Sequence, residues 1–170
     1  QAHYVSAIEL GCGNGVFSEF LAGRCQSLLS IDGNQKAVKL AKQRLLKHSN
    51  VKLIQGVIPQ ALSDGPTADH QTYHLIVISE ILYYLSSSDI DVVINWALHN
   101  LALNGTLLCC HWRYAIDGFA MTGQGMVSAS GWEKEHFKRF ETVFSGHFHH
   151  KNDDGQIYYF KDDIPGEILD

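Results

Sequence analysis

The sequence predicts an α/β fold: a doubly wound, mostly parallel sheet followed by a C-terminal antiparallel strand pair. Strand-like apolar runs alternate with amphipathic helical stretches along the first two thirds of the chain. Residues 74–79 are almost wholly apolar, as in a strand that helices cover on both faces. A glycine-rich turn at residues 11–15 follows the first run and opens a helix. A chain of 170 residues can bury one substantial core, so we expect a single domain over residues 1–170.

The individual elements follow from periodicity and from the residues that interrupt it. In chain order we expect a strand at 4–10, a helix at 16–24, a strand at 27–31, a helix at 37–46, a strand at 51–55, a polar connection at 60–72, a strand at 74–79, a helix at 88–101, a turn at Asn104-Gly105 and a strand at 106–111. Residues 114–131 are rich in glycine and have no clear period, which predicts a substrate loop. Beyond it we expect a helix at 132–140 and an antiparallel pair at 142–150 and 156–161.

Charge and hydropathy exclude several classes of partner. Charged residues make up 18% of the chain and the formal net charge is −5, without the basic cluster that nucleic acid or an anionic membrane requires. No apolar run approaches the ~18 residues of a membrane-spanning helix, and no signal-peptide pattern opens the chain. The expected partner is therefore a small molecule, with no nucleic acid and no membrane.

The cysteine and histidine patterns favour a reduced, metal-free protein. Neither zinc spacing nor a disulfide framework is present among the cysteines, so we expect free thiols and a cytoplasmic location. They are Cys12, Cys25, Cys109 and Cys110. His147, His149 and His150 partly alternate along a predicted strand, but no acid or thiol at ligand spacing completes a metal site.

Two acids flank the glycine turn. Gly11, Gly13 and Gly15 let the backbone adopt positive φ and approach a ligand with no Cβ in the way. Asp32 ends the second predicted strand 21 residues after Gly11, where a carboxylate can accept both hydroxyls of a ribose. Glu9 directly precedes the turn and would repel a pyrophosphate. This acid favours an amine-bearing ligand over a dinucleotide.

These residues resemble the class I S-adenosylmethionine-dependent methyltransferases. That family's first motif, acid-x-Gly-x-Gly-x-Gly, is matched from Glu9 to Gly15, and its acid at the end of strand two by Asp32. Residues 73–85 look like its fourth strand and following loop, and residues 103–107 look like its Pro-Gly-Gly turn into strand five. More narrowly, Ser79-Glu80-Ile81-Leu82-Tyr83-Tyr84-Leu85 is similar to the nodulation protein S-like N-methyltransferases, which modify the amine of a chitooligosaccharide.

The resemblance implies a Rossmann-like methyltransferase fold with a seven-stranded sheet and S-adenosylmethionine as cofactor. The acceptor that it implies is an amine, such as an amino sugar or oligosaccharide, ahead of a hydroxyl.

The sequence departs from the family pattern in three places. Val57 stands where the family often has an Asp for the adenine amine, and His74 replaces the usual Asp that opens strand four. Gln1 lies only a few residues before strand one, so we expect the N-terminal helices that help close the cofactor site to be short or missing.

The resemblance also assigns cofactor contacts at the carboxyl ends of the strands. Glu9 would favour the ammonium end of the cofactor and Asp32 would hold its ribose. Val57 and Ile58 would flank the adenine. The expected cofactor-binding residues are Glu9, Gly11, Cys12, Gly13, Gly15, Asp32, Gly33, Val57, Ile58, Ser79 and Glu80.

Residues after strands four and five would face the methyl group. His111 is the first choice for general base because an unperturbed histidine titrates near neutral pH. Glu80 and Tyr83 are the other expected catalytic residues. The expected substrate-binding residues are Tyr84, Trp112 and Arg113. Structural alternatives stay open. His111 can be a hydrogen-bonded strand end, Glu80 a solvated loop carboxylate and Arg113 part of a structural ion pair, the tyrosines can belong to the core, and residues 114–131 can be a plain connection.

Two other functions remain open at this point. A nicotinamide-dependent oxidoreductase is disfavoured by Glu9 and by a glycine pattern that ends at Gly15, without the later glycine of the dinucleotide fingerprint. A module that binds the cofactor without catalysis is the alternative from a different class.

Overall fold

The computed structural model describes residues 3–63, 72–110, 146–150 and 157–161. The chain divides into two compact units, residues 1–111 and residues 112–170. The elements of the first unit, in chain order, are β1 (Tyr4–Leu10), α1 (Val16–Ala22), β2 (Cys25–Asp32), α2 (Gln35–Arg44), β3 (Val51–Gln55), the 3-10 helix η1 (Gln60–Leu62), β4 (Tyr73–Ser79), the 3-10 helix η3 (Leu82–Tyr84), α3 (Ser87–Asn100) and β5 (Leu101–Cys110).

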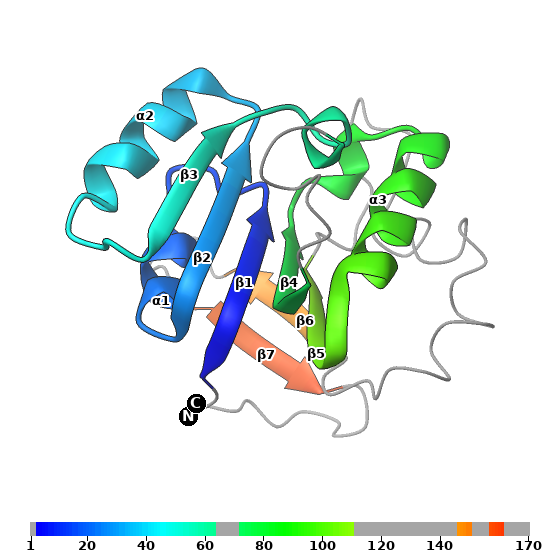
Figure 1. The fold of residues 1–170 in the computed structure, drawn as a ribbon. Coiled ribbons are helices and arrows are strands. Elements are labelled where there is room, and N and C mark those ends of the chain that lie inside the picture. Colours follow the sequence, from blue (N-terminus) through cyan, green and yellow to red (C-terminus); the bar gives the residue numbers. More distant parts are fainter. Residues whose placement is uncertain (1–2, 64–71, 111–145, 151–156, 162–170) are drawn as a thin grey trace. The chain divides into compact units, whose positions relative to one another are not determined.

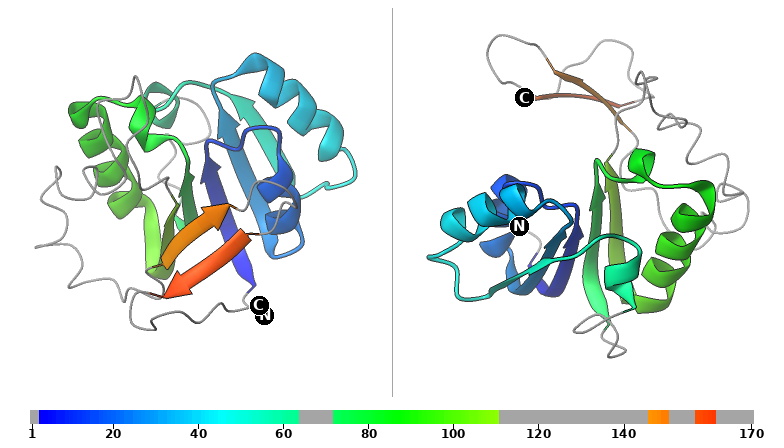
Figure 2. Two further views of the ribbon diagram at one scale, coloured as in Figure 1. Left: turned by 180° about the vertical axis from the view of Figure 1, so that it is seen from behind. Right: turned by 90° about the horizontal axis from the view of Figure 1, so that it is seen from above.

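Five parallel strands form the sheet of this unit in the order β3-β2-β1-β4-β5. The chain begins in the middle, winds outward to β3, and then continues with β4 and β5 on the other side of β1 (Figure 1). Helices α1 and α2 cover one face of the sheet and α3 covers the other, as Figure 2 shows from above. The order of the strands reverses between β1 and β4, which is where open α/β sheets bind ligands at the carboxyl ends of their strands.

The strand register brings the candidate site residues to one edge. Glu9 of β1 lies beside Ser30 of β2 and Val77 of β4. Asp32 at the end of β2 lies beside Gln55 at the end of β3. Because all these strands are parallel, the segments that follow β1, β2, β3 and β4 leave the sheet at the same edge.

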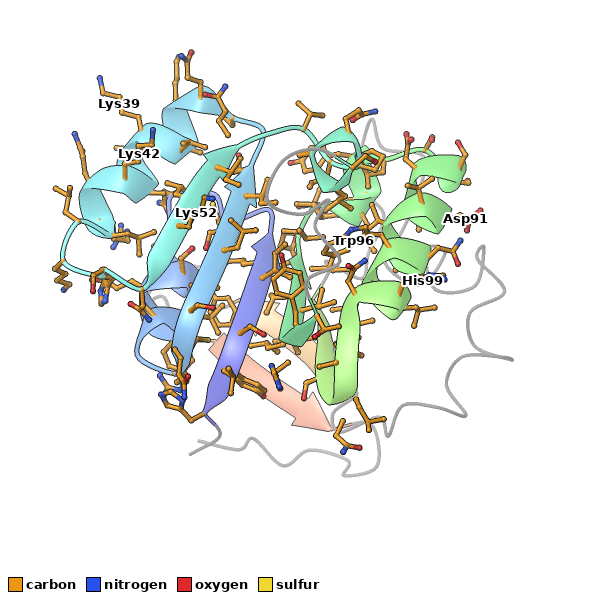
Figure 3. The ribbon with its side chains drawn as sticks, in the orientation of Figure 1. Lys39, Lys42, Lys52, Asp91, Trp96 and His99 are labelled. Carbon is orange, nitrogen blue, oxygen red and sulfur yellow. The ribbon has the colours of Figure 1, made fainter. Side chains whose placement is uncertain are left out.

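Central strands supply the core. Side chains with no exposed surface include Ile8, Leu10, Ile31, Ile76, Val77 and Ile78. On the face of the sheet that α3 covers, Trp96 points toward the strands (Figure 3). Its ring centroid lies 6.0 Å from that of Tyr73. Helices on both faces account for the almost wholly apolar strand at residues 74–79, so the sequence-based interpretation of this strand is confirmed.

Several helix and strand boundaries differ from the predicted ones by two residues. Strand β2 begins at Cys25 rather than 27, and α1 ends at Ala22 rather than 24. Helix α2 begins at Gln35 rather than 37 because the Asn34 side chain accepts the backbone N–H groups of Lys36 and Ala37, a helix cap.

The turn predicted at Asn104-Gly105 interrupts the pairing of β5 with β4. Both residues lie inside β5, which begins at Leu101 directly after α3. Pairing between β4 and β5 shifts register between Tyr73 and Leu75, and Asn104 has a φ of +63°. Four residues of β5, Ala102 to Gly105, thus stand opposite the single residue His74 of β4, which is more than the one extra residue of a bulge. The local pattern marked this turn, because Asn and Gly both tolerate positive φ, but it did not show that β5 already begins before it.

In the second unit, β6 (Gly146–His150) pairs antiparallel with β7 (Ile157–Lys161) in a two-stranded sheet. A seven-stranded sheet that includes this pair stays a prediction. The expected loop at 114–131 and helix at 132–140 lie outside the described residues. None of the helices within the described ranges has the length and apolarity that a bilayer crossing requires.

Candidate functional site

The glycine turn lies at the carboxyl end of β1, and its three glycines serve different purposes. Gly11, Gly13 and Gly15 all have positive φ, at +85°, +53° and +80°. A Cβ on Gly11 would overlap the side chain of Ile81, which follows β4. Gly13 is different, because a Cβ built there meets no atom within 4 Å. Gly11 is thus needed for packing within the protein, whereas Gly13 faces open space that a ligand can occupy.

Asp32 holds this turn from the end of β2. Its Oδ2 accepts the backbone N–H of Gly13 at 2.8 Å, and its Oδ1 accepts the N–H of Asn34 at 2.7 Å. A carboxylate has about four acceptor positions, so these two bonds leave capacity for the hydroxyls of a ligand. The structure therefore brings together the two features that the sequence placed 21 residues apart.

Glu9 lies beneath the turn and is only 1% exposed. Its Oε2 accepts hydrogen bonds from Ser18 Oγ of α1 at 2.5 Å and from Ser30 Oγ of β2 at 3.1 Å, and the two hydroxyls are 3.2 Å apart. Burial raises the pKa of the Glu9 carboxyl above its ordinary value, and the two serine hydrogen bonds oppose that rise. In this structure Glu9 joins β1, β2 and α1 through these bonds.

Ser18 and Ser30 were missed by the sequence-based prediction. Both side chains are fully buried. Polar residues at otherwise apolar positions of an amphipathic helix and a buried strand are the signal that could have found them. Their partner, however, follows only from the register that places Glu9 beside Ser30.

Cys12 contributes its backbone rather than a reactive side chain. The thiol is buried, and burial together with the nearby carboxylates of Glu9 and Asp32 raises its pKa to about 12. The Cys12 carbonyl accepts the N–H of Gly15 at 2.9 Å, which closes the turn. A neutral thiol of this kind is a small packing group.

The expected adenine contacts lie close together beyond β2 and β3. A Cβ on Gly33 would stand 3.5 Å from Cγ2 of Val57. Val57 is 63% exposed, whereas Ile58 is 9% exposed and belongs to the buried core. Val57 thus presents an apolar surface at the site edge.

A carboxylate and two tyrosines follow β4, which ends at Ser79. The Tyr83 hydroxyl donates to Oε2 of Glu80 at 3.0 Å, and the ring centroids of Tyr83 and Tyr84 are 4.6 Å apart. Glu80 has a φ of +56°, an uncommon conformation for a residue with a side chain. Burial and the Glu80 carboxylate raise the pKa of Tyr83, so its hydroxyl stays protonated at neutral pH and acts as a donor.

The structure does not describe the remaining predicted residues. His111, Trp112 and Arg113 lie outside the described residues, as do residues 114–131. Among the residues that the structure describes, no three His, Cys, Asp or Glu side chains converge as metal ligands.

Comparison with known proteins links this geometry to methyltransferases. The family model described as Nodulation protein S (NodS) matches residues 1–117. Nodulation protein S of Sinorhizobium fredii is 35% identical over 102 residues, which are 59% of this chain and 43% of that protein. Nodulation protein S of Bradyrhizobium diazoefficiens is 27% identical over 140 residues, which are 77% of this chain and 64% of that protein. The chain thus spans less than two thirds of the length of these curated relatives.

Solved structures agree with the family match. N-methyltransferase NodS from Bradyrhizobium japonicum WM9 in complex with S-adenosyl-L-homocysteine superimposes with a TM-score of 0.63 and 26% identity, over 76% of this chain and 65% of that one. A methyltransferase structure from Pseudomonas syringae gives a TM-score of 0.62 and 30% identity, over 89% of this chain and 83% of that one. The chain has a Rossmann-like methyltransferase fold, with a parallel sheet of five strands.

Proposed function

The chain belongs to the nodulation protein S family, and from this premise we propose that it transfers a methyl group from S-adenosylmethionine to an amine of a small molecule. The observation that carries the proposal is the glycine turn, held by Asp32 at the point where the strand order reverses. A family relative whose structure is named an N-methyltransferase, in complex with S-adenosyl-L-homocysteine, supports both the cofactor and the amine.

The residues present fit this cofactor. Open space at Gly13 admits a ligand against the backbone, and Asp32 keeps acceptor positions for two ribose hydroxyls. The exposed Val57 side chain offers an apolar surface for the adenine ring. Gly33 beside it leaves room for the ring to approach the chain. Glu9 keeps a hydrogen-bonding carboxyl below the turn, where the ammonium end would lie.

When bound, S-adenosylmethionine supplies an electrophilic methyl group on a sulfonium. The protein then has to align the acceptor amine and take the proton that an ammonium must lose before its nitrogen lone pair can attack. Glu80 suits the binding of a cationic amine, because it places a carboxylate directly after β4, where the Tyr83 hydroxyl donates to its Oε2. Tyr83 orients that carboxylate, and the exposed Tyr84 ring offers an apolar face for a sugar or methylammonium.

We propose His111 as the base that removes the proton, with Glu80 as the residue that binds the amine. The acceptor that these groups favour is an amine, such as an amino sugar or oligosaccharide, ahead of a hydroxyl. A carboxylate beside tyrosines attracts a cation, whereas a neutral hydroxyl gains only ordinary hydrogen bonds there. Trp112 and Arg113 stay predicted acceptor-binding residues, and residues 114–131 stay a predicted substrate loop.

Calorimetric titration tests the cofactor. We expect binding of S-adenosylmethionine and S-adenosylhomocysteine and none of NAD, and absence of binding of the first two would refute the proposal.

Transfer of a labelled methyl group to a panel of amines and matched alcohols then tests the reaction. Turnover of amines supports the proposal, turnover of alcohols alone would reassign the acceptor, and cofactor binding without turnover would favour a non-catalytic module. In the active protein, His111→Ala and Glu80→Gln separate proton removal from amine binding, since the first should lower kcat and the second should raise KM for the amine.

A further inference from the structure

We propose that Arg44 is a positioning residue for the glycine turn, which it holds in the shape that receives the cofactor; this inference rests on the proposed function. The sequence motifs of the turn do not include Arg44. It is the last residue of α2, and its Nε–H donates to the backbone carbonyl of Asn14 at 3.1 Å, across 30 residues of sequence. Asn14 stands between Gly13 and Gly15 in the middle of the turn.

Packing brings the end of α2 against the turn. A Cβ on Gly15 would lie 3.0 Å from Cβ of Ala41 and 3.4 Å from Cδ1 of Leu45. This close approach places the last turn of α2 directly beside residues 14 and 15. The hydrogen bond from Arg44 is therefore part of a packed contact between α2 and the turn.

The same guanidinium also contacts α1. Nη1 of Arg44 lies 3.5 Å from Oε2 of Glu19, and Nζ of Lys47 lies 2.9 Å from Oε1. Lys47 and then Arg44 lower the pKa of Glu19, so the carboxylate keeps its charge at neutral pH. The Glu19 backbone N–H donates to the Gly15 carbonyl at 3.0 Å. Arg44 thus joins the turn to the first part of the helix that the turn opens.

Two side chains hold the turn, one through a backbone N–H group and the other through a backbone carbonyl. Asp32 accepts the N–H of Gly13, and Arg44 donates to the carbonyl of Asn14. Glycines on both sides of Asn14 give this segment many accessible conformations, so an unrestrained turn would lose more entropy when a ligand orders it. Arg44 reduces that loss by ordering the turn before the cofactor arrives.

Amide hydrogen exchange of residues 11–15 in the free protein tests the first step. We expect Arg44→Gln to make the amides of Gly13 and Gly15 exchange several-fold faster. Arg44→Lys keeps a charge for Glu19 but lacks the planar Nε–H, so it should behave like Arg44→Gln. The matched control is Lys42→Gln, a loss of the same charge at an exposed residue of the same helix (Figure 3), which forms neither of these bonds in the described part of the chain. Exchange that is unchanged in Arg44→Gln would overturn the inference.

Cofactor affinity tests the consequence. Calorimetry with S-adenosylhomocysteine should give a Kd about 2–10-fold higher for Arg44→Gln and Arg44→Lys, the range for one lost hydrogen bond, and an unchanged Kd for Lys42→Gln. The melting temperature serves to separate positioning from stability, because a purely structural role would lower Tm and leave the Kd of the folded protein unchanged. Faster exchange with unchanged affinity would also contradict the inference. If the wild-type chain binds no S-adenosylhomocysteine, the proposed function fails, and the exchange measurement still decides the role of Arg44 in holding the turn.

Discussion

At Asp32, one carboxylate both shapes the turn and is proposed to bind the ribose. Its bonds to Gly13 and Asn34 use one acceptor position on each oxygen. We expect Asp32→Ala to weaken S-adenosylhomocysteine binding by about 1–3 kcal/mol, the scale of hydrogen bonds to a charged group. Titration calorimetry measures the change. Asp32→Asn, which keeps one acceptor oxygen, should show a smaller loss, and equal affinity of all three proteins would remove Asp32 from the site.

At Glu9, burial predicts a particular dependence of stability on pH. The folded pKa is raised from the ordinary value of 4.5, chiefly because burial disfavours the charged carboxylate. An acid of this kind contributes its full stability below the unfolded pKa and loses it as pH rises through the folded pKa. Relative to Glu9→Gln, we therefore expect the free energy of unfolding of the wild type to fall as the pH rises above 4.5.

Denaturant titrations at a series of pH values measure this difference. Ser18→Ala offers a second check, because the lost hydrogen bond no longer opposes the rise in the Glu9 pKa. The fall in stability should then extend to higher pH than in the wild type. A difference between wild type and Glu9→Gln that stays constant with pH would contradict the role of burial.

At the scale of elements, α1 is bounded by two glycines in opposite conformations. Gly15 before it has a φ of +80°, whereas Gly23 after it has a φ of −75°. We expect Gly15→Ala to lower the free energy of unfolding by about 1–3 kcal/mol, because the residue must keep a left-handed conformation. Its new methyl group would also press on Ala41 of α2, at 3.0 Å.

Gly23→Ala is the matched control for α1. The nearest atom to a Cβ there is a backbone oxygen at 3.8 Å, an ordinary contact. The substitution should be neutral or should stabilise by about 0.4–1 kcal/mol, because it restricts the unfolded chain. Urea denaturation measures the free energy of unfolding of both variants. Equal changes would mean that the left-handed backbone at Gly15 does not constrain the start of α1.

At the scale of the first unit as a whole, the site depends on the central strands that carry it. Ile76 lies in β4, between β1 and β5, and has no exposed surface. Ile76→Ala should cost about 2–5 kcal/mol of unfolding free energy through the cavity that it leaves. Leu103→Ala in β5, where the side chain is 91% exposed, should change stability by at most about 0.5 kcal/mol. Chemical denaturation provides both values, and a similar cost at the two positions would contradict the buried arrangement of β4.

Much of this arrangement follows from local patterns. The strand bounds 4–10 and 51–55 were predicted to the residue, and the apolar run at 74–79 correctly indicated a strand between two helical layers. The turn at Asn104-Gly105 was recognised, but the part of β5 that precedes it, from Leu101, was missed. The capping role of Asn34 was missed, so the predicted start of α2 was two residues too late.

The fold class, the glycine turn and the position of Asp32 follow from the amino-acid sequence, because hydrophobic periodicity and the need for positive φ are local properties. Which residues these features contact follows from the packing of the folded chain. Glu9 joins Ser18 and Ser30, and Arg44 reaches Asn14, because strand order and helix packing bring together segments far apart in the chain. No local pattern contains that information. The difference between Gly11, which packs on Ile81, and Gly13, which faces open space, has the same origin.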